Sequence, residues 1–415
     1  MTPLPPVSLV IVSRDRAAEL DRLLSALRFQ TVGNVDLVLV TNGPAPDGPA
    51  PAFRHIRFDA ANIAAARNRG WQAARGDLVF FIDDDAIPEP RWLERMISGF
   101  ADPSVGQVGG RTLRRNGVDI QFDAALVGPG GADHPAPRGR GKVRVLNPAN
   151  GLFPRVMGTN MGFRRDTLLM LGGFDEGYRF FLDETDLSLR LGRARWATAY
   201  VPSAQVQHFS ASSNRRSPAR VPRDLTEIGA SMGLFLARHA GAHVDAARDH
   251  FLDRQEVRLR RFFALGYMSP AALAARRREL RDGLKAGADR ARTPPPSALD
   301  LPAPSGARPA TIRNVREVAL VPAGPRSRRA ARAEAARLAA DGIAVTCLDF
   351  RPSPLFLQVR FDPAGFWSHR GGIWGRGNRR DPLIAVGGRT GRVQRELARL
   401  AGQRKFSEIL TDFGN

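Results

Sequence analysis

The sequence has almost no cysteine and almost no lysine. Cys347 is the single cysteine among 415 residues, so no disulfide can form within the chain and a reducing compartment is the expected setting. No apolar run approaches the roughly 20 residues that a membrane span needs. The first apolar run, residues 7–12, has no basic segment before it and predicts a strand rather than a signal peptide. We therefore expect a protein that stays inside the cell.

The formal net charge is +21, and all but three of the 62 basic residues are arginine. They are spread along the chain together with abundant alanine, glycine and proline, which is the usage of a GC-rich genome and requires no functional explanation. A functional charge would instead favour anionic membrane surfaces, sugar phosphates or lipid-linked diphosphates. Specific nucleic-acid binding is not expected, because no zinc-finger spacing or aromatic RNA-binding motif accompanies the arginines.

Strand and helix signals alternate in the N-terminal half. Apolar runs at residues 7–12, 35–40 and 78–82 predict buried strands, and helical spacing predicts helices over residues 17–29 and 63–75. This order predicts an α/β fold with a parallel sheet and right-handed crossovers. Ligands bind beyond the carboxyl ends of such strands, where the polar turns of this sequence lie.

The middle and C-terminal parts are less regular. Further expected elements are strands at 106–111 and 196–201, helical turns at 167–171 and 187–191, a mobile surface loop at 128–141, helices from about Pro222 through 248–265 and 270–285, and a β-α-β unit at 318–321, 326–340 and 342–348. We predict four segments: residues 1–221, a helical extension over 222–292, a Pro/Ala-rich linker over 293–309 and a small Rossmann-like unit over 310–415. The last unit lacks a phosphate-binding fingerprint, so no role is assigned to it.

The strand at 78–82 runs into three adjacent carboxylates, Asp83, Asp84 and Asp85. Because they repel one another, a cation is expected to neutralise them, and oxygen-rich sites of this kind suit Mg²⁺ or Mn²⁺ bridging to substrate phosphates. The alternative is a solvated acidic turn, or a cap for the helix that begins near Pro90. The triplet taken alone leaves both interpretations open.

Two further features could carry chemistry. On a helix, Asp183, Asp186 and Arg190 share one face while Glu184 points elsewhere, so one carboxylate could pair with arginine while another serves as a general base. The alternative is a helix start at which acidic residues favour the dipole. His208 follows a strand and would by itself be a packed residue, but as a ligand it would favour Mn²⁺ over Mg²⁺.

The order of these features resembles the successive motifs of family 2 glycosyltransferases over about residues 5–215. The matching segments are residues 7–16, Thr41-Asn42-Gly43, residues 62–70, Phe80-Phe81-Ile82-Asp83-Asp84-Asp85 with Pro88 and Trp92-Leu93, residues 158–164 and Gly172-Gly173-Phe174-Asp175-Glu176. Residues 183–190 occupy the place of the catalytic acidic motif, and His208 that of a late histidine ligand. Six motifs in the family's order form a joint signal that no single motif carries.

The resemblance implies an inverting transferase of the GT-A fold that binds a nucleoside-diphosphate sugar and a divalent metal, Mn²⁺ or Mg²⁺. It implies donor-binding roles for Ser13, Arg14, Asn42, Arg67, Asp83 and Asp84, metal-binding roles for Asp85, Asp83 and His208, and catalytic roles for Glu184, Asp183 and Asp186. Glu184 would remove the proton from the acceptor hydroxyl, which attacks the anomeric carbon opposite the departing diphosphate.

Two positions depart from the family pattern. Thr41 stands where an aspartate is usual, which weakens the inference of a uracil base, and Asp183-Glu184 stands where Glu-Asp is usual, which leaves the identity of the base open. The expected acceptor is a glycan or lipid-linked hydroxyl, as in surface polysaccharide synthesis, and the expected setting is the cytoplasm, with peripheral association at the inner membrane face. The alternatives are a nucleotide-sugar-binding protein that has lost transfer activity, and a basic scaffold that binds polyanions.

Overall fold

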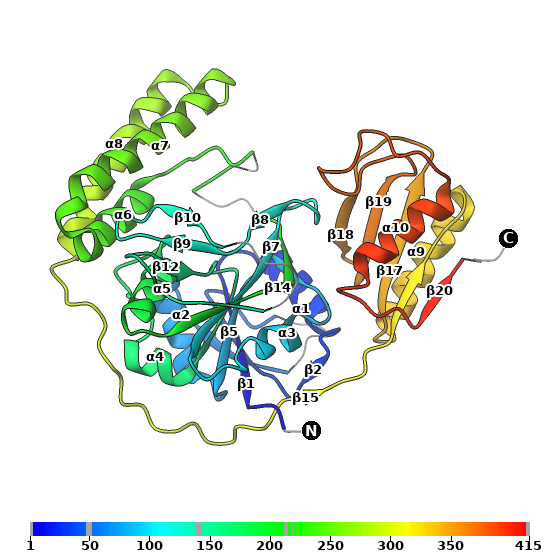
Figure 1. Cartoon of the computed structure of the whole chain (residues 1–415), viewed down its shortest axis with the longest axis horizontal. Coiled ribbons are helices and arrows are strands. Elements are labelled where there is room, and N and C mark those ends of the chain that lie inside the picture. Colours follow the sequence, from blue (N-terminus) through cyan, green and yellow to red (C-terminus); the bar gives the residue numbers. More distant parts are fainter. Residues whose placement is uncertain (1–2, 47–51, 138–142, 211–214, 218, 412–415) are drawn as a thin grey trace.

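The computed structural model describes residues 3–46, 52–137, 143–210, 215–217 and 219–411. Along the chain it forms an α/β part built on a ten-stranded sheet, a group of helices that includes a long hairpin, and a second α/β part built on a five-stranded sheet (Figure 1).

The large sheet has the strand order β11-β14-β7-β13-β5-β1-β3-β4, with β6 paired to β14 and β8 paired to β7. Its strands are β1 (Val7–Ser13), β3 (Asp36–Thr41), β4 (Phe53–Arg57), β5 (Leu78–Asp83), β6 (Ala86–Pro88), β7 (Val105–Leu113), β8 (Ile120–Phe122), β11 (Arg144–Leu146), β13 (Asn160–Arg164) and β14 (Ala197–His208). The strands expected from continuous apolar runs, β1, β3 and β5, are confirmed. Their sequences are apolar throughout because both faces of the sheet are buried; in β5, for example, Phe80 packs into one core and Phe81 into the other.

The parallel arrangement predicted from the β-α-β-α-β order is confirmed for β1, β3 and β5, but β13, which was not predicted, runs antiparallel to both β5 and β7. The neighbouring strands β5, β1, β3 and β4 are parallel as expected. The chain enters β13 at the end from which the parallel strands leave, since Asn160 pairs with Ile82 and Arg164 with Leu78. The segment just before β13 therefore lies at the carboxyl end of β5, beside the acidic triplet.

Helices cover both faces of this sheet. They are α1 (Ala17–Leu27), α2 (Ile63–Ala73), α3 (Trp92–Ser98), α4 (Arg165–Leu171) and α5 (Asp183–Arg193). The apolar side chains of α1 and α3 pack on one face, and those of α2, α4 and α5 on the other. This two-sided cover is what the apolar strand sequences require, because a parallel sheet must bury both faces.

A small sheet joins β9 (Ala125–Val127), β10 (Asp133–Pro135) and β12 (Phe153–Arg155). The loop expected at residues 128–141 therefore contains a strand, because residues 133–135 pair with β9; residues 138–141 lie outside the described part of the chain. Two further short strands, β2 (Val32–Gly33) and β15 (Thr311–Ile312), pair with each other.

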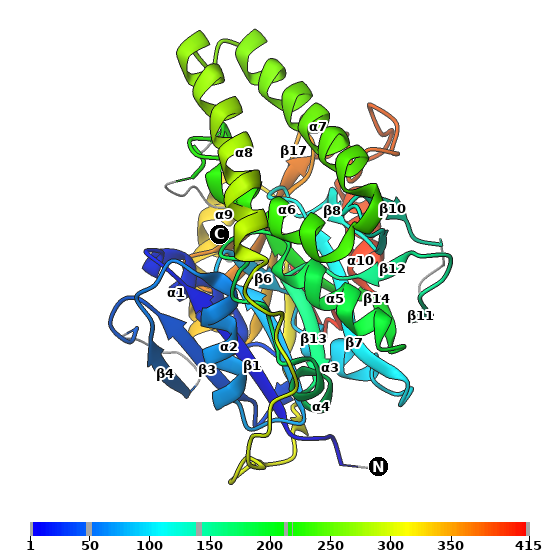
Figure 2. The ribbon, with the colours of Figure 1, turned by 90° about the vertical axis from the view of Figure 1, so that its left-hand side faces the viewer.

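The helical group consists of α6 (Thr226–His239), the short 3₁₀ helix η1 (Gly241–His243), α7 (Val244–Ala264) and α8 (Pro270–Arg290). Glycines on α6 and α8 allow the two backbones to touch: a Cβ at Gly287 would lie 1.9 Å from the carbonyl oxygen of Ala230, and one at Gly233 would lie 2.1 Å from that of Leu284. The contact anchors the base of α8, while α7 and the rest of α8 extend away from the sheet (Figures 1 and 2).

Residues 291–310, all of them described, form neither helix nor strand and run along the large α/β part, where Leu299 donates a backbone hydrogen bond to Leu169. The C-terminal part then forms β16 (Glu317–Leu320), α9 (Pro325–Ala340), β17 (Ala344–Arg351), β18 (Gln358–Asp362), β19 (Phe366–Gly372), α10 (Arg389–Leu400) and β20 (Glu408–Leu410). Its strand order is β18-β19-β17-β16-β20.

The C-terminal part shares a hydrophobic core with α1. Phe29 lies edge-on to Trp367 with 5.7 Å between ring centroids, and Ala26 and Ile87 belong to the same cluster. The buried Arg404 donates to Glu89 at 2.8 Å across the same contact. The linker therefore joins two parts that pack on each other, and the buried aromatic rings oppose their separation.

Candidate active site

A cavity of about 980 Å³ opens beyond the carboxyl ends of β1 and β5. Its walls come from the turns after β1 and β5, the start of α2, the segment before β13, the start of α5 and the described residues of 215–224. This is the edge at which the sequence predicted a ligand site.

Asp85 and His208 meet in this cavity although 123 positions separate them. The Nε2 atom of His208 lies 3.1 Å from Oδ1 of Asp85, and Arg16 reaches Oδ2 of Asp85 at 3.7 Å. Potential ligand atoms of Asp83, Asp85 and His208 all lie within 4.8 Å of one another. The reason is the length of β14: it does not stop at 201, as expected, but continues until His208 pairs with Ala86 of β6.

Asp84 turns into the protein. One carboxylate oxygen accepts a hydrogen bond from the Ser13 hydroxyl at 2.8 Å, and the other accepts from Arg16 at 2.9 Å. Burial, opposed by Arg16 and reinforced by Asp85, raises the pKa of Asp84 to about 7. Asp84 therefore ties the end of β1 to the turn after β5.

Arg67 of α2 links the triplet to the start of α5. Its buried guanidinium donates to Asp183, to Asp83 at 3.1 Å and to the carbonyl of Gly158 at 3.3 Å. The second oxygen of Asp83 accepts from the Thr159 hydroxyl. Asp183 is thus held in a buried ion pair, which is how a charged side chain is tolerated inside a protein.

Glu184 has a different environment from Asp183. Both residues line the cavity, but the side chain of Glu184 is 17% exposed against 4% for Asp183, and Glu184 forms a salt bridge of 3.7 Å with Arg155. Burial and the neighbouring Asp183 raise the pKa of Glu184 to about 7, although Arg155 and Arg67 oppose the shift. A carboxyl group that is poised between its two protonation states near neutral pH can accept a proton there.

Asp186 is not among the described residues that line the cavity. It is fully buried and accepts hydrogen bonds from Arg190 and from His239 of α6, both at 2.8 Å. The sequence left open which carboxylate pairs with Arg190, and the structure shows that it is Asp186. The geometry separates Asp186 from the other acidic residues of its motif and makes it a link between α5 and α6.

The side chains expected near the nucleoside form hydrogen bonds with neighbouring turns of the protein. The Asn42 side chain accepts from the backbone of Asp15 at 3.0 Å and donates to its carboxylate at 2.7 Å, which joins the turns after β1 and β3. Arg14 donates to the carbonyl of Asp59. Thr41, the position that departs from the family pattern, is buried and lies 2.8 Å from Nε2 of His55.

Sequence reasoning missed several residues of the site. Arg16 contacts Asp84 and Asp85, and Arg179, Arg215, Arg216 and Arg223 also line the cavity. The pair Arg215-Arg216 soon after His208 was the available sequence signal, but it was hidden by the general excess of arginine.

A further missed residue is Gln121 of β8. Its side-chain oxygen lies 3.1 Å from Nδ1 of His208, so Gln121 can accept a hydrogen bond from a proton on Nδ1, and in that tautomer the lone pair of Nε2 is available to a metal ion beside Asp85. No pattern in the sequence points to Gln121, because its role depends on the pairing of β8 with β7.

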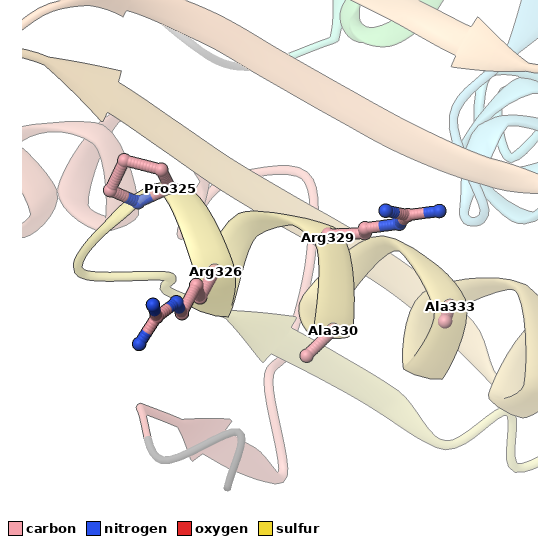
Figure 3. Close-up of a pocket in the computed structure, with 5 residues that line it drawn as sticks. All are labelled: Pro325, Arg326, Arg329, Ala330 and Ala333. Atoms are coloured by element: carbon pink, nitrogen blue, oxygen red, sulfur yellow. The ribbon is translucent and has the colours of Figure 1, made fainter. Parts of the chain in front are cut away.

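A second depression lies on α9 and is lined by Pro325, Arg326, Arg329, Ala330 and Ala333 (Figure 3). All five residues come from one helix, and the two arginine side chains extend in different directions. Such a surface does not enclose a ligand, so we assign it no site.

Among the described residues, none of the helices combines the length and apolarity that crossing a bilayer would require.

Comparisons with known proteins agree on the class of enzyme. The family model described as Glycosyl transferase family 2 matches residues 8–169. An N-acetylglucosaminyl-diphospho-decaprenol L-rhamnosyltransferase of Mycobacterium tuberculosis is 29% identical over 278 residues, which cover 58% of this chain and 87% of the relative. A pre-mycofactocin glycosyltransferase of the same organism is 27% identical over 49% of this chain, and the match spans 42% of that relative.

Among solved structures, a mannosyltransferase from Pyrobaculum calidifontis in complex with GDP-Man and Mn²⁺ matches with a TM-score of 0.40 and 16% identity, over 70% of this chain and 88% of that chain. The expected fold class, a Rossmann-like GT-A sheet with a small C-terminal α/β part, is confirmed. The N-terminal part of the chain carries the family's sequence pattern on the sheet described above: residues 8–169 match glycosyl transferase family 2, and the relatives that align with this part are glycosyltransferases.

Proposed function

We propose that this glycosyltransferase transfers a sugar, with inversion, from a nucleoside-diphosphate sugar to a hydroxyl group of a glycan or lipid-linked acceptor, and that it requires a divalent metal. The observation that carries the proposal is the meeting, in one cavity, of the Asp83–Asp85–His208 group with Glu184. The relative named for transfer to a diphospho-decaprenol acceptor supports a lipid-linked acceptor for this chain as well.

The residues present fit a metal ion. Two carboxylates and one imidazole converge within 4.8 Å, and this mixed set suits Mn²⁺ better than Mg²⁺, which prefers oxygen ligands alone. Asp85 and His208 would hold the ion, and Asp83 would join them. A bound divalent cation supplies positive charge for the diphosphate as it departs.

Arginines supply further positive charge for the diphosphate. Arg16 is adjacent to Asp84 and Asp85. Arg216, which lines the cavity from the segment after β14, interacts electrostatically with Asp85. Guanidinium groups bind phosphate through planar, charge-assisted hydrogen bonds. We assign Ser13, Arg14 and Asn42 to the nucleoside side; Asn42 joins the turns after β1 and β3, and Ser13 joins the end of β1 to the turn after β5.

Glu184 is the proposed base. Both carboxylates line the cavity, but Asp183 is held by the buried Arg67, whereas Glu184 is more exposed and has a pKa of about 7. Glu184 takes the proton of the acceptor hydroxyl as the oxygen attacks the anomeric carbon. The new carbon–oxygen bond forms on the face opposite the bond to the diphosphate, which breaks, so the configuration inverts. Asp183 holds Arg67, and Asp186 holds α5 against α6.

The proposal is tested by a thermal-shift screen of nucleoside diphosphates and their sugars, with and without Mn²⁺, followed by sugar release from the best donor. A selectively bound donor should raise the melting temperature, since binding to the folded state alone stabilises it. A response to donors without release or transfer of sugar would favour the impaired binding protein. Salt-sensitive binding to any polyanion, without selectivity for a nucleotide, would favour the scaffold.

Gln121 offers a test of the metal site that is independent of transfer. Replacing Gln121 with leucine should weaken Mn²⁺ binding about 10-fold or more, because the imidazole of His208 loses the contact that orients it. Isothermal titration of Mn²⁺ into the protein without donor measures the effect. Gln121→Glu keeps an acceptor opposite Nδ1 and should retain the wild-type affinity. Equal Mn²⁺ affinity in the wild type and in Gln121→Leu would remove His208 from the proposed ligands.

The proposed setting is cytoplasmic. The single cysteine, Cys347, is buried in the core of the C-terminal part, and its burial raises the pKa of the thiol to about 12. A thiol in this state is unreactive and needs no oxidising compartment.

A further inference from the structure

The free end of the α7–α8 hairpin carries large apolar side chains in solvent. Phe263, Leu265 and Tyr267 are 42%, 59% and 59% exposed, and they occupy the last turn of α7 and the turn that follows it. Figures 1 and 2 show this end as the point of the hairpin farthest from the large sheet. The side of the hairpin that faces inward is already packed, since Phe251, Leu259 and the leucines of α8 are buried. The exposed residues are therefore not part of the core.

The same end is strongly basic. Residues 254–278 contain seven arginines and one acidic residue, Glu256. Glu256 is shared between Arg260 and Arg277, at 2.6 and 2.9 Å, and Glu279, directly after this segment, pairs with Arg276, so four of the seven arginines have no acidic partner among the described residues. Arg254 and Arg261 are exposed and make no ion pair with any described residue.

We propose that the free end of the hairpin docks on an anionic lipid bilayer, with Phe263, Leu265 and Tyr267 at the boundary of the acyl chains and the arginines against the headgroups. Aromatic and aliphatic side chains at the tip, with arginines just behind them, match the apolar and anionic layers of a membrane surface in order. Long arginine side chains extend readily towards headgroups while their stems remain near the apolar layer.

Charge argues for this partner over a second copy of the chain. The protein has a formal net charge of +21, and the tip itself offers Glu256 as its sole acidic group, so two tips repel each other. A nucleic acid would use the arginines but not the exposed apolar residues, whose burial is the second source of binding free energy on a membrane.

The hairpin stands beside the mouth of the cavity. Burial lowers the pKa of Arg258 of α7, and the like charges of Arg220 and Arg216 add to the shift; Arg216 in turn lines the cavity. The glycine contact between α6 and α8 fixes the base of the hairpin. Docking would therefore hold the cavity mouth near the lipid surface. The benefit of holding the cavity mouth near the lipid rests on the proposed lipid-linked acceptor, whereas the docking of the hairpin does not depend on that proposal.

The test is flotation of the full-length protein with vesicles of neutral lipid and with vesicles that contain about 30% anionic lipid. The wild type should bind the anionic vesicles at least about 10-fold more tightly than the neutral ones. The variant Phe263→Ser/Leu265→Ser/Tyr267→Ser should lose about 10-fold or more in affinity for anionic vesicles, since it removes three large apolar groups. Arg254→Gln/Arg261→Gln should lose about 25-fold, at roughly fivefold for each arginine.

Matched controls lie in the C-terminal part. Leu383→Ser/Ile384→Ser/Val386→Ser removes residues that are at least as exposed as those of the tip, and Arg326→Gln/Arg329→Gln removes two exposed arginines of α9. Both controls should bind within about twofold of the wild type. Losses in the controls equal to those in the hairpin variants would overturn the proposal. Full binding by the apolar triple variant would also overturn it, because attachment would then be purely electrostatic.

The docking proposal and the proposed transfer function are tested by independent experiments, so one can be wrong while the other stands. Vesicle binding needs no donor, and the donor-dependent thermal shift needs no vesicle. If the hairpin variants retain the donor response and lose vesicle binding, the docking proposal is supported. If the wild type responds to a donor but ignores anionic vesicles, the docking proposal is wrong and the transfer proposal stands.

Discussion

Replacing Glu184 with glutamine should reduce sugar transfer by about 10³-fold while the affinity for the donor stays within about twofold of the wild type. Glutamine has nearly the same shape as glutamate but cannot take the proton of the acceptor hydroxyl. Glu184 lines the cavity and its one salt bridge to a described residue, with Arg155, is 3.7 Å long, so the substitution removes a base and weakens only that contact. Transfer is measured by release of the nucleoside diphosphate, and donor binding by thermal shift.

The neighbouring carboxylate provides the comparison that separates the two candidates. Replacing Asp183 with asparagine leaves the buried guanidinium of Arg67 without its main partner, which should cost about 3–5 kcal/mol of stability. We therefore expect Asp183→Asn to lower the melting temperature clearly and Glu184→Gln to change it little. A transfer rate that survives in Glu184→Gln and is lost in Asp183→Asn without a change in melting temperature would make Asp183 the base.

The raised pKa of Glu184 also predicts a pH dependence. Only the ionised carboxylate can accept a proton, so kcat/KM should rise with pH and level off above about 7, the pKa that burial and Asp183 produce. The stability changes in the opposite direction. The folded-state pKa lies above the ordinary value of 4.5, so the contribution of Glu184 to stability is full below about 4.5 and is lost as pH rises through about 7. The melting temperature of Glu184→Gln should lack this component.

Replacing Asp85 with asparagine should abolish the effect of Mn²⁺ on the melting temperature and reduce transfer by at least about 100-fold. A metal that stabilises the departing diphosphate supplies several kcal/mol to the reaction, and each 1.4 kcal/mol corresponds to about a factor of ten. Chelation of the metal should have the same effect on the wild type as the substitution has in the presence of Mn²⁺.

Asp84→Asn is the matched control within the triplet. Both oxygens of Asp84 are engaged by Ser13 and Arg16, and its pKa of about 7 means that the neutral form is already well populated near neutral pH. The neutral amide should therefore leave Mn²⁺ affinity within about threefold of the wild type. Loss of the Mn²⁺ response in Asp84→Asn but not in Asp85→Asn would reverse the proposed assignment of the two residues.

The sequence was sufficient to predict the strands and helices whose burial shows in the pattern of neighbouring apolar residues. Continuous apolar runs identify β1, β3 and β5 because both faces of these strands are covered, and the end of β5 places the acidic triplet at the ligand-binding edge. The order of motifs was sufficient for the family, and helical spacing was sufficient for α6, α7 and α8. Each of these conclusions depends on residues that are close in sequence.

Tertiary structure decided the features that depend on pairing between distant segments. β13 is antiparallel because the chain re-enters the sheet from the cavity side, and His208 reaches Asp85 because β14 extends to pair with β6. A local pattern can show that a strand is buried, but it does not record which strand lies beside it.

The separation of Asp183 from Glu184 has the same origin. The two carboxylates are adjacent in the chain and equivalent in chemistry, and Arg67, more than a hundred positions earlier, selects one of them. The sequence by itself thus determined the resemblance to family 2 glycosyltransferases, the buried strands and the acidic group at their end. The fold alone decided which carboxylate is held by an ion pair, which one faces the cavity and which histidine joins the triplet, because long-range packing sets the neighbours on which charge and pKa depend.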